Sequence, residues 1–200
     1  MGSNWTDLSG AGNHVTDIGG TTNISVARPV GAPAYIYGAP TAWMNFPAGI
    51  LPSAEYTLFY VARYNGAVRR RIFQGVDTNW NTGFWNGRAG MAHHGSCEWI
   101  TSIDDKHDID WVLGTDRSNS FRSNGKERAS AGNTCAVFDR LAINTGHHSS
   151  EASDFAIQSV LVYNVKLSDA DVQRVEAWLF AQQPSFTPAN LQVCPYHEAT

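Results

Sequence analysis

This chain of 200 residues contains three Asn-Gly pairs, and each follows a short run that contains aromatic residues. They stand at Asn65-Gly66, Asn86-Gly87 and Asn124-Gly125. A type I′ turn needs a positive φ at both central residues, which Asn and Gly adopt most readily, so an Asn-Gly pair between two such runs predicts a β-hairpin. We therefore expect a series of short antiparallel strands.

The clearest predicted strand is residues 55–63, a β-branched and aromatic stretch that is too short for a typical helix. We expect residues 70–75 to be its hairpin partner. Residues 155–163 carry apolar side chains at both alternating sets of positions, which predicts a central strand with both faces covered. Further strands are predicted at 84–85, 89–92, 109–115, 120–123, 126–129 and 139–143, and shorter ones within residues 1–50.

Only one segment has the features of a helix. Ser168 is a predicted N-cap, and Asp169 and Asp171 would stand in the first turn, where negative charge favours the helix dipole. Pro184 would end the helix. The apolar residues expected on its buried stripe are Val172, Val175, Trp178 and Leu179. One short helix among many strands predicts an all-β sandwich or barrel.

The composition fits a single folded domain. With 42% hydrophobic residues the chain can bury a full core, so disorder is excluded. Its net charge of −4 argues against non-specific nucleic-acid binding, which needs a cationic surface. The longest apolar run is far shorter than the ~18 residues of a membrane span. We expect no nucleic-acid partner and no membrane insertion.

The three cysteines form no CxxC motif, so neither a zinc ribbon nor a thioredoxin-type redox site is indicated. They either remain separate thiols or form one disulfide, with Cys97–Cys135 and Cys135–Cys194 as the candidate pairs. Sequons at Asn4 and Asn23 favour a secreted protein, although such triplets also occur by chance.

Aromatic, amide and basic side chains are concentrated in residues 79–99. A sugar ring stacks its CH face on an indole, while amide, guanidinium and imidazole groups bond its hydroxyls, so this mixture is typical of sugar recognition. Strand alternation directs Phe84 and Trp85 to opposite faces, so at most one of them fills the core. Trp80 stands in an Asn-rich stretch that we expect to be a loop. The candidate ligand-binding residues, with core packing as the alternative role of the tryptophans, are Asn79, Trp80, Trp85, Arg88, His93, His94 and Trp99.

The densest acidic run is a candidate calcium site, because calcium requires several hard oxygen donors. Its four carboxylates stand within seven residues, at Asp104, Asp105, Asp108 and Asp110. No linear EF-hand pattern is present, so other loops would complete the site, and a solvated acidic surface is the alternative. The adjacent His93 and His94 would point to opposite faces of a strand, so they cannot bind one transition-metal ion together.

The chain lacks the usual motifs of catalytic carboxylates. A retaining glycosidase needs two carboxylates about 5–5.5 Å apart, and an E-x-D-x-x-E triplet would place them on one sheet face, but none occurs here. Asp108 and Asp110 have alternate spacing and form a weaker candidate pair. There is no G-x-S-x-G motif, and residues 147–149 (HHS) do not indicate a serine triad. We therefore expect a non-catalytic protein.

Three stretches carry a family resemblance. They are the opening 5–14 (WTDLSGAGNH), the stretch 153–164 (SDFAIQSVLVYN), which contains the predicted strand 155–163, and the stretch 167–179 (LSDADVQRVEAWL), which contains most of the predicted helix. They resemble the start and the end of LamG-like jelly-roll domains in the concanavalin A-like lectin/glucanase superfamily, over about residues 5–180. The resemblance implies two antiparallel sheets packed as a jelly roll, carbohydrate binding or adhesion, and, in many members, bound calcium.

We interpret residues 1–184 as one LamG-like jelly-roll domain with a short C-terminal helix, and residues 185–200 as a strap or a linker. The favoured function is a non-catalytic carbohydrate-binding or adhesion module. Its partner would be a glycan or glycoprotein surface, and its location extracellular, on a cell surface or on a virion. The alternatives are a structural or protein-interaction jelly roll, as in a viral capsid, fibre or cell-surface assembly, and, less favoured, a glycan-cleaving enzyme.

Overall fold

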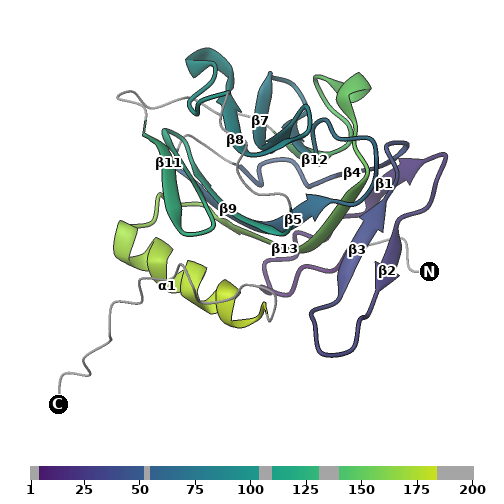
Figure 1. The fold of residues 1–200 in the computed structure, drawn as a ribbon, viewed down its shortest axis with the longest axis horizontal. Coiled ribbons are helices and arrows are strands. Elements are labelled where there is room, and N and C mark those ends of the chain that lie inside the picture. The colour runs from purple at the N-terminus through teal and green to yellow at the C-terminus, as the bar shows by residue number, and fades with distance from the viewer. Residues whose placement is uncertain (1–4, 52–54, 104–109, 131–139, 184–200) are drawn as a thin grey trace.

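The computed structural model describes residues 5–51, 55–103, 110–130 and 140–183. Figure 1 shows two β-sheets packed face to face, with one helix against the outer side of one of them. Neighbouring strands in both sheets run antiparallel. The expected all-β, two-sheet jelly-roll sandwich with one short C-terminal helix is confirmed.

The two sheets differ in size. The six-stranded sheet has the spatial order β1 (Asp17–Gly20), β4 (Ala42–Asn45), β12 (Leu141–Ile143), β6 (Phe73–Gly75), β7 (Trp80–Trp85) and β8 (Arg88–His94). The seven-stranded sheet has the order β11 (Lys126–Ser130), β10 (Ser120–Ser123), β9 (Val112–Arg117), β5 (Thr57–Tyr64), β13 (Phe155–Tyr163), β3 (Tyr35–Gly38) and β2 (Ser25–Ala27). The helical elements are α1 (Asp169–Ala181) and the single 3₁₀ turns η1 (Gly95–Cys97) and η2 (Ser149–Glu151).

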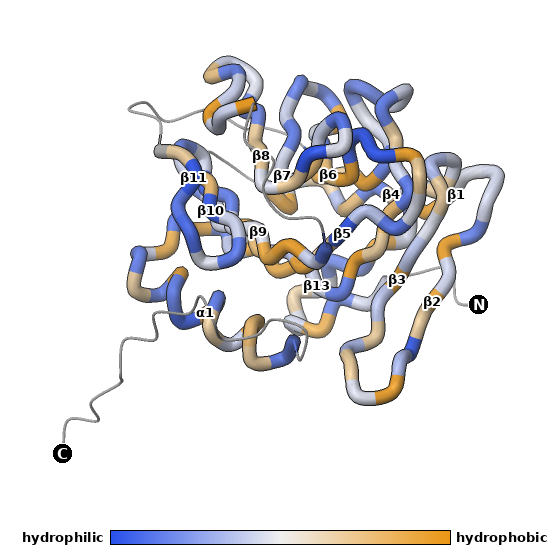
Figure 2. Tube along the Cα trace, viewed as in Figure 1, coloured by the Kyte–Doolittle hydropathy of each residue, from blue (hydrophilic) through white to orange (hydrophobic). Residues whose placement is uncertain are grey.

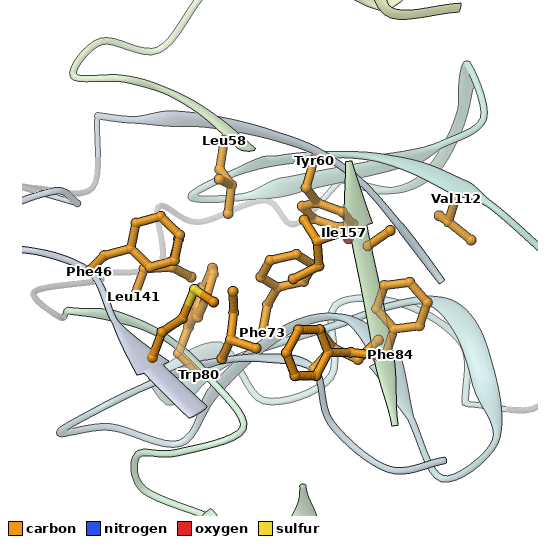
Figure 3. Packing of buried hydrophobic residues seen from close by; sticks show 14 of the residues in the cluster. Phe46, Leu58, Tyr60, Phe73, Trp80, Phe84, Val112, Leu141 and Ile157 are labelled. Carbon is orange, nitrogen blue, oxygen red and sulfur yellow. The ribbon is translucent and has the colours of Figure 1, made fainter. Parts of the chain in front are cut away.

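The hydrophobic core lies between the two sheets. Because side chains alternate along a strand, Leu58 and Tyr60 of β5 point into it, as do Trp80 and Phe84 of β7. Figure 3 shows these residues gathered around Phe73 in the middle of the sandwich. In Figure 2 hydrophobic positions are concentrated along strands such as β9 and β13, whereas many connecting loops are hydrophilic.

Tyr60 fills the space beside a glycine from each sheet. A Cβ atom built at Gly83 of β7, or at Gly114 of β9, would overlap the phenol ring of Tyr60. The Tyr60 hydroxyl lies 3.4 Å from Thr82 Oγ1, on the opposite sheet. The two glycines therefore make room for the one large side chain that crosses the core at this point.

The helix α1 covers part of the outer face of the seven-stranded sheet. Ser168 caps it as expected, since its hydroxyl oxygen accepts a hydrogen bond from the Asp171 backbone N–H at 3.2 Å. Val172 and Leu179 are buried against the outward side chains of β5 and β9, in a second hydrophobic cluster separate from the core. The helix ends at Ala181, and both Pro184 and the predicted strap or linker 185–200 lie outside the described residues.

The predicted buried stripe of α1 is wrong at one position. Trp178 is 57% exposed, although Val172 and Leu179 are buried as expected. The helix instead buries Glu176, whose carboxylate accepts two hydrogen bonds from the Arg122 guanidinium, both at 2.9 Å, and one from the Thr115 hydroxyl at 2.8 Å. This carboxylate joins the helix to Thr115 of β9 and Arg122 of β10. The helix therefore contacts the sheet through a buried ion pair as well as through apolar side chains, and Trp178 is not part of that contact.

Two of the three Asn-Gly pairs form the expected turns. Asn86 and Gly87 have φ values of 48° and 79°, and Asn124 and Gly125 have 49° and 77°, the positive pairs that a type I′ turn requires. They connect β7 to β8 and β10 to β11. The predicted central strand is also confirmed, since β13 pairs with β5 on one side and with β3 on the other.

The third pair does not close a hairpin, so the predicted pairing of 55–63 with 70–75 is wrong. The chain passes from β5 in one sheet to β6 in the other, and the neighbours of β5 are β9 and β13. Asp154 holds this crossing: its carboxylate accepts from the Val68 backbone N–H at 2.8 Å, and its carbonyl accepts from the Asn65 N–H at 3.1 Å. The long-range contact with Asp154 overrides the local turn preference of Asn65-Gly66.

Candidate functional site

The β7–β8 hairpin and its flanks carry all seven candidate ligand-binding residues. Alternation divides them into two groups, because Trp80 and His94 point into the core while Trp85 and His93 point out of the six-stranded sheet. The predicted opposition of Phe84 and Trp85 is confirmed: Phe84 is completely buried and Trp85 is partly exposed.

The structure corrects the expectation for Trp80 and His94. Trp80 is the first residue of β7 rather than part of a loop, and its side chain is completely buried in the core. Its ring stacks on the imidazole of His94, with centroids 6.0 Å apart and planes at 22°. Since both side chains have 0% exposure, neither can contact a ligand at the surface.

His94 takes part in a buried polar network that connects the two sheets. Its Nε2 lies 2.9 Å from Asp116 Oδ2 of β9, and its Nδ1 lies 3.0 Å from the Ser118 carbonyl oxygen, which can only accept. The Tyr56 hydroxyl donates to Asp116 Oδ1 at 2.5 Å. Burial acts to lower the pKa of His94. The charge of Asp116 and the hydrogen bonds of His94 to Asp116 and to the Ser118 carbonyl outweigh this effect, so the pKa is raised above its usual value. This network stabilises the core and is closed to ligands.

The outward group forms a small aromatic surface, which we call the tryptophan platform and which consists of Trp85, Trp99, His93 and Arg88. The rings of Trp85 and Trp99 lie 4.9 Å apart at 58°, and the His93 ring meets the Trp99 ring edge-on at 5.1 Å. The Arg88 guanidinium lies 5.8 Å from the centre of the Trp85 ring. Both tryptophans are partly exposed, so their rings are accessible at the surface.

A short extension of the sheet holds Trp99 in this position. After the 3₁₀ turn η1, the chain turns back along β8, where His93 and Trp99 form an antiparallel bridge. The Ile100 N–H donates to the Ala92 carbonyl at 3.1 Å, and the His94 N–H donates to the Glu98 carbonyl at 2.8 Å. Backbone pairing therefore places the two tryptophans side by side, although they stand 14 positions apart in the sequence.

Asn79 and Arg71, which is buried although its arginine run was expected to be solvated, fix the orientation of His93. His93 Nδ1 lies 2.7 Å from the Asn79 carbonyl oxygen, so this nitrogen carries the proton. Arg71 donates from Nη1 to Asn79 Oδ1 at 2.8 Å and from Nε to Glu151 Oε2 at 2.7 Å. Burial, followed by the nearby Arg71 charge, lowers the pKa of His93 despite its hydrogen bond to Asn79. The ring is therefore neutral near pH 7, and its Nε2 is a hydrogen-bond acceptor.

The sequence contains a signal for Arg71 but none for its partner. Arg71 ends a run of three arginines, whereas Glu151 stands 80 residues further along the chain. Their contact depends on η2 lying beside β6, since the Arg71 N–H also donates to the Glu151 carbonyl at 2.7 Å. The pairing of Arg71 with Glu151 therefore depends on the topology of the sandwich, and no local sequence pattern indicates it.

The predicted calcium donors are only partly within the described residues. Asp104, Asp105 and Asp108 lie outside them. Asp110 is exposed, and its carboxylate pairs with the Arg63 guanidinium at 3.1 Å. Within the described ranges, no group of three His, Cys, Asp or Glu side chains is arranged to hold a metal ion. The calcium site therefore stays a prediction.

Cys97 is disulfide-bonded. Neither Cys135 nor Cys194 lies within the described residues. A bond at Cys97 agrees with the predicted Cys97–Cys135 pair and rules out both three separate thiols and a Cys135–Cys194 pair, which would leave Cys97 free. Disulfides persist in oxidising compartments, such as the extracellular space. None of the described helices is long and apolar enough to cross a membrane.

No protein-family model and no curated protein matches the sequence. The structure is nevertheless similar to several solved domains. One is domain 4 of AbnA, a GH43 extracellular arabinanase from Geobacillus stearothermophilus solved in complex with arabinotriose, with a TM-score of 0.62 and 16% identity. That match covers 80% of this chain and 86% of the arabinanase domain.

Two further matches are to parts of larger chains. A mutant Trypanosoma rangeli sialidase has a TM-score of 0.62 and 14% identity, covering 92% of this chain but 32% of the sialidase. The binding domain of Paraclostridial Mosquitocidal Protein 1 has a TM-score of 0.61 and 13% identity, covering 87% of this chain and 49% of that domain. At these identities the likeness establishes the sandwich fold alone, and the neighbours include binding domains of this architecture.

Proposed function

We propose that this protein is a non-catalytic carbohydrate-binding module and that the tryptophan platform is its binding surface. The observation that carries the proposal is the partly exposed pair of Trp85 and Trp99, held 4.9 Å apart on the outer face of the six-stranded sheet. Aromatic rings at a surface bind the apolar CH face of a sugar, and the polar groups around them determine which hydroxyls are recognised.

The polar groups beside the two rings have complementary roles. The Arg88 guanidinium only donates hydrogen bonds, and it stands next to Trp85. The neutral His93 imidazole stands against Trp99 and accepts at Nε2. A sugar hydroxyl both donates and accepts; Arg88 offers it donors at the surface, whereas the His93 imidazole, which is 8% exposed, supports Trp99 against the sheet. The Asn79 carbonyl fixes the orientation of the His93 ring, and Arg71 in turn holds the Asn79 side chain.

The comparisons support the proposal in general terms. Solved domains with the same fold include an arabinanase domain in complex with arabinotriose and the binding domain of a toxin. The LamG-like resemblance of the sequence points to the same class of function, and the disulfide at Cys97 favours an extracellular or cell-surface location. A non-catalytic role is supported by the sequence, which lacks the E-x-D-x-x-E spacing of sandwich-fold glucanases.

Affinity electrophoresis of the intact chain against a panel of soluble plant, bacterial and animal polysaccharides tests this function. We expect retardation by at least one polysaccharide, and a loss of about tenfold or more in affinity for Trp85→Ala and for Trp99→Ala, since a central aromatic contact dominates such an interface. Tyr37→Ala is the matched control, because Tyr37 is a 37% exposed aromatic residue on the other sheet. Its affinity should equal that of the wild type.

Circular dichroism and thermal unfolding of each variant show whether the fold is intact. Wild-type affinity in both tryptophan variants would refute the platform, and a failure to bind any member of the panel would refute the proposed function. Release of oligosaccharides from a panel member would instead favour the alternative of a glycan-cleaving enzyme.

A further inference from the structure

The exposed Trp178 marks a second surface, on the other side of the sandwich from the tryptophan platform. At 57% exposure it is the most exposed aromatic side chain among the described residues. It stands one position before Leu179, which is buried against the seven-stranded sheet, so the helix directs the indole sideways along the edge of its contact with the sheet. The helix packs without it, because Val172 and Leu179 provide the buried contact with the sheet.

Two hollows lie beside this indole, and Trp178 lines both. The larger, of about 560 Å³, lies between the β2–β3 loop and the C-terminal end of α1. Figure 1 shows that loop and the yellow end of the helix on the same side of the seven-stranded sheet. The smaller, of about 340 Å³, is lined by Leu161, Tyr163, Arg174 and Val175. The larger hollow is shallow and open to solvent, so a ligand there would lie on the surface and would not be enclosed.

The lining of the larger hollow combines one aromatic face with neutral polar groups. Gln182 and Gln183 provide amides, Ser159 of β13 provides a hydroxyl, and the loop contributes the backbone of residues 31–33. None of its lining residues carries a charge. An anion would therefore find no cation there, and a purely apolar partner would bury the amides without replacing their hydrogen bonds.

One residue that lines this hollow has an amide oxygen without a hydrogen-bond partner. Gln183 is 4% exposed, and its Oε1 is buried with no partner among the described residues. Buried acceptors without a donor are rare because they cost free energy. A hydroxyl group of a ligand would supply the missing hydrogen-bond donor.

We propose that the larger hollow beside Trp178 is a second binding site and that it takes a neutral sugar unit. The sugar ring stacks on the indole of Trp178, its hydroxyls donate to amide oxygens such as Gln183 Oε1, and the Ser159 hydroxyl and the Gln182 amide contact its edge. This site shares no residue with the tryptophan platform and faces the opposite direction, so each can bind without the other.

Nitrogen–proton correlation spectra of the isotopically labelled full chain test the proposal. The probes are cellohexaose, xylohexaose, mannohexaose and maltohexaose, all of them neutral. The spectrum of Trp178→Ala assigns the Trp178 indole signal, and the spectra of Trp85→Ala and Trp99→Ala assign those of the platform. We expect at least one hexasaccharide to shift the Trp178 signal, both in the wild type and in Trp85→Ala.

Two substitutions on the same helix sharpen the test. Gln183→Ala should weaken the affinity measured at the Trp178 signal by about tenfold. Gln173→Ala is the matched control: Gln173 is an exposed amide of α1 that does not line the hollow, so this variant should bind as the wild type does. Should Gln183→Ala fail to fold, Gln182→Ala provides the same comparison.

The outcomes separate this site from the platform. Shifts of the Trp85 and Trp99 signals alone would overturn the second site and leave the proposed function intact. Shifts of the Trp178 signal alone would support the second site and overturn the platform. No shift of any tryptophan signal with the four probes would overturn the second site as stated, and equal binding by Gln183→Ala and Gln173→Ala would overturn the role assigned to the amide.

Discussion

At the scale of single residues, the strongest constraint is the pair of His94 and Asp116. Both side chains are completely buried and contact each other at 2.9 Å, while Tyr56 donates to the second carboxylate oxygen. A buried pair of charges gains little over an apolar replacement, but removal of one partner leaves the other charge without compensation. The contribution of this network to stability is therefore seen most clearly when one of its partners is removed.

Asp116→Asn should lower the free energy of unfolding by about 3–5 kcal/mol at a pH where His94 is protonated, because a neutral amide cannot compensate the charge of the buried imidazolium. Urea denaturation at pH 6 measures the change. The matched control is Asp110→Asn, since Asp110 belongs to an exposed ion pair that contributes little. Equal stability of the two variants would contradict the role of the buried network.

The same pair makes stability depend on pH in a defined direction. The pKa of His94 is raised in the folded state, so its contribution is fully present below the unfolded value of about 6.5 and is lost as the pH rises through the higher folded value. His93 and His148 have lowered pKa values and act in the opposite sense. We therefore compare the wild type with Asp116→Asn, which removes the carboxylate that raises the pKa of His94 and keeps His93 and His148 in place.

Between pH 6 and pH 9 the difference in unfolding free energy between the two proteins should become smaller as the pH rises. Urea denaturation at several pH values measures it. A difference that is constant over this range would show that His94 does not titrate as a partner of Asp116.

At the scale of elements, the sequence predicted correctly those turns and caps whose contacts are made by residues close together in the chain. The Asn86-Gly87 and Asn124-Gly125 turns and the Ser168 cap depend on residues two to four positions apart, so they were predictable. The β5–β6 hairpin was predicted wrongly because the crossing is held by Asp154, about 90 residues away. Alternation also separated the outward Trp85 from the inward Phe84, but the edge-strand position of Trp99 came from a bridge that no local pattern signals.

The cap of α1 is a testable element of this kind. Ser168→Ala should destabilise the protein by about 1 kcal/mol, because the Asp171 N–H loses its acceptor. Ser168→Thr keeps both the acceptor for the Asp171 N–H and the hydroxyl that donates to the Asp171 carboxylate, and should remain close to the wild type. Thermal unfolding of the three proteins measures the effect, and an unchanged midpoint in Ser168→Ala would show that the cap does not limit stability.

The fit of Tyr60 against β9 gives a second prediction. Gly114→Ala should destabilise the fold by about 1–3 kcal/mol, because the added methyl group would overlap the phenol ring. Chemical denaturation of Gly114→Ala, Tyr60→Leu and the double variant measures the coupling. The smaller side chain should accommodate the methyl group, so strict additivity in the double variant would contradict the proposed clash.

At the scale of the whole molecule, the two layers give the protein two independent outer surfaces. The β7–β8 hairpin presents the tryptophan platform on the six-stranded sheet, and α1 presents Trp178 over the seven-stranded sheet. The layered fold was predictable from the number of strand signals and the single helix. Which tryptophans are buried was not predictable. Trp80 was expected in a loop and is buried in the core, whereas Trp178 was expected on the buried side of the helix and is exposed.

Reduction should destabilise the molecule as a whole. Because Cys97 is disulfide-bonded, dithiothreitol should lower the free energy of unfolding by about 2–4 kcal/mol through greater freedom of the unfolded chain. Urea denaturation with and without the reductant measures this loss, and Cys97→Ser should match the reduced wild type in both conditions. A Cys97→Ser variant that still responds to dithiothreitol would contradict the assignment.

The position of Cys97 has a consequence beyond stability. It is the last residue of η1, and the next residues are those that turn back along β8 and seat Trp99 against Trp85. A covalent anchor two positions before Trp99 limits how far this segment can move away from the sheet edge. We therefore expect the position of the Trp85 and Trp99 rings to depend on the oxidation state of the surroundings, with a newly made, still reduced chain holding this segment less firmly against the sheet.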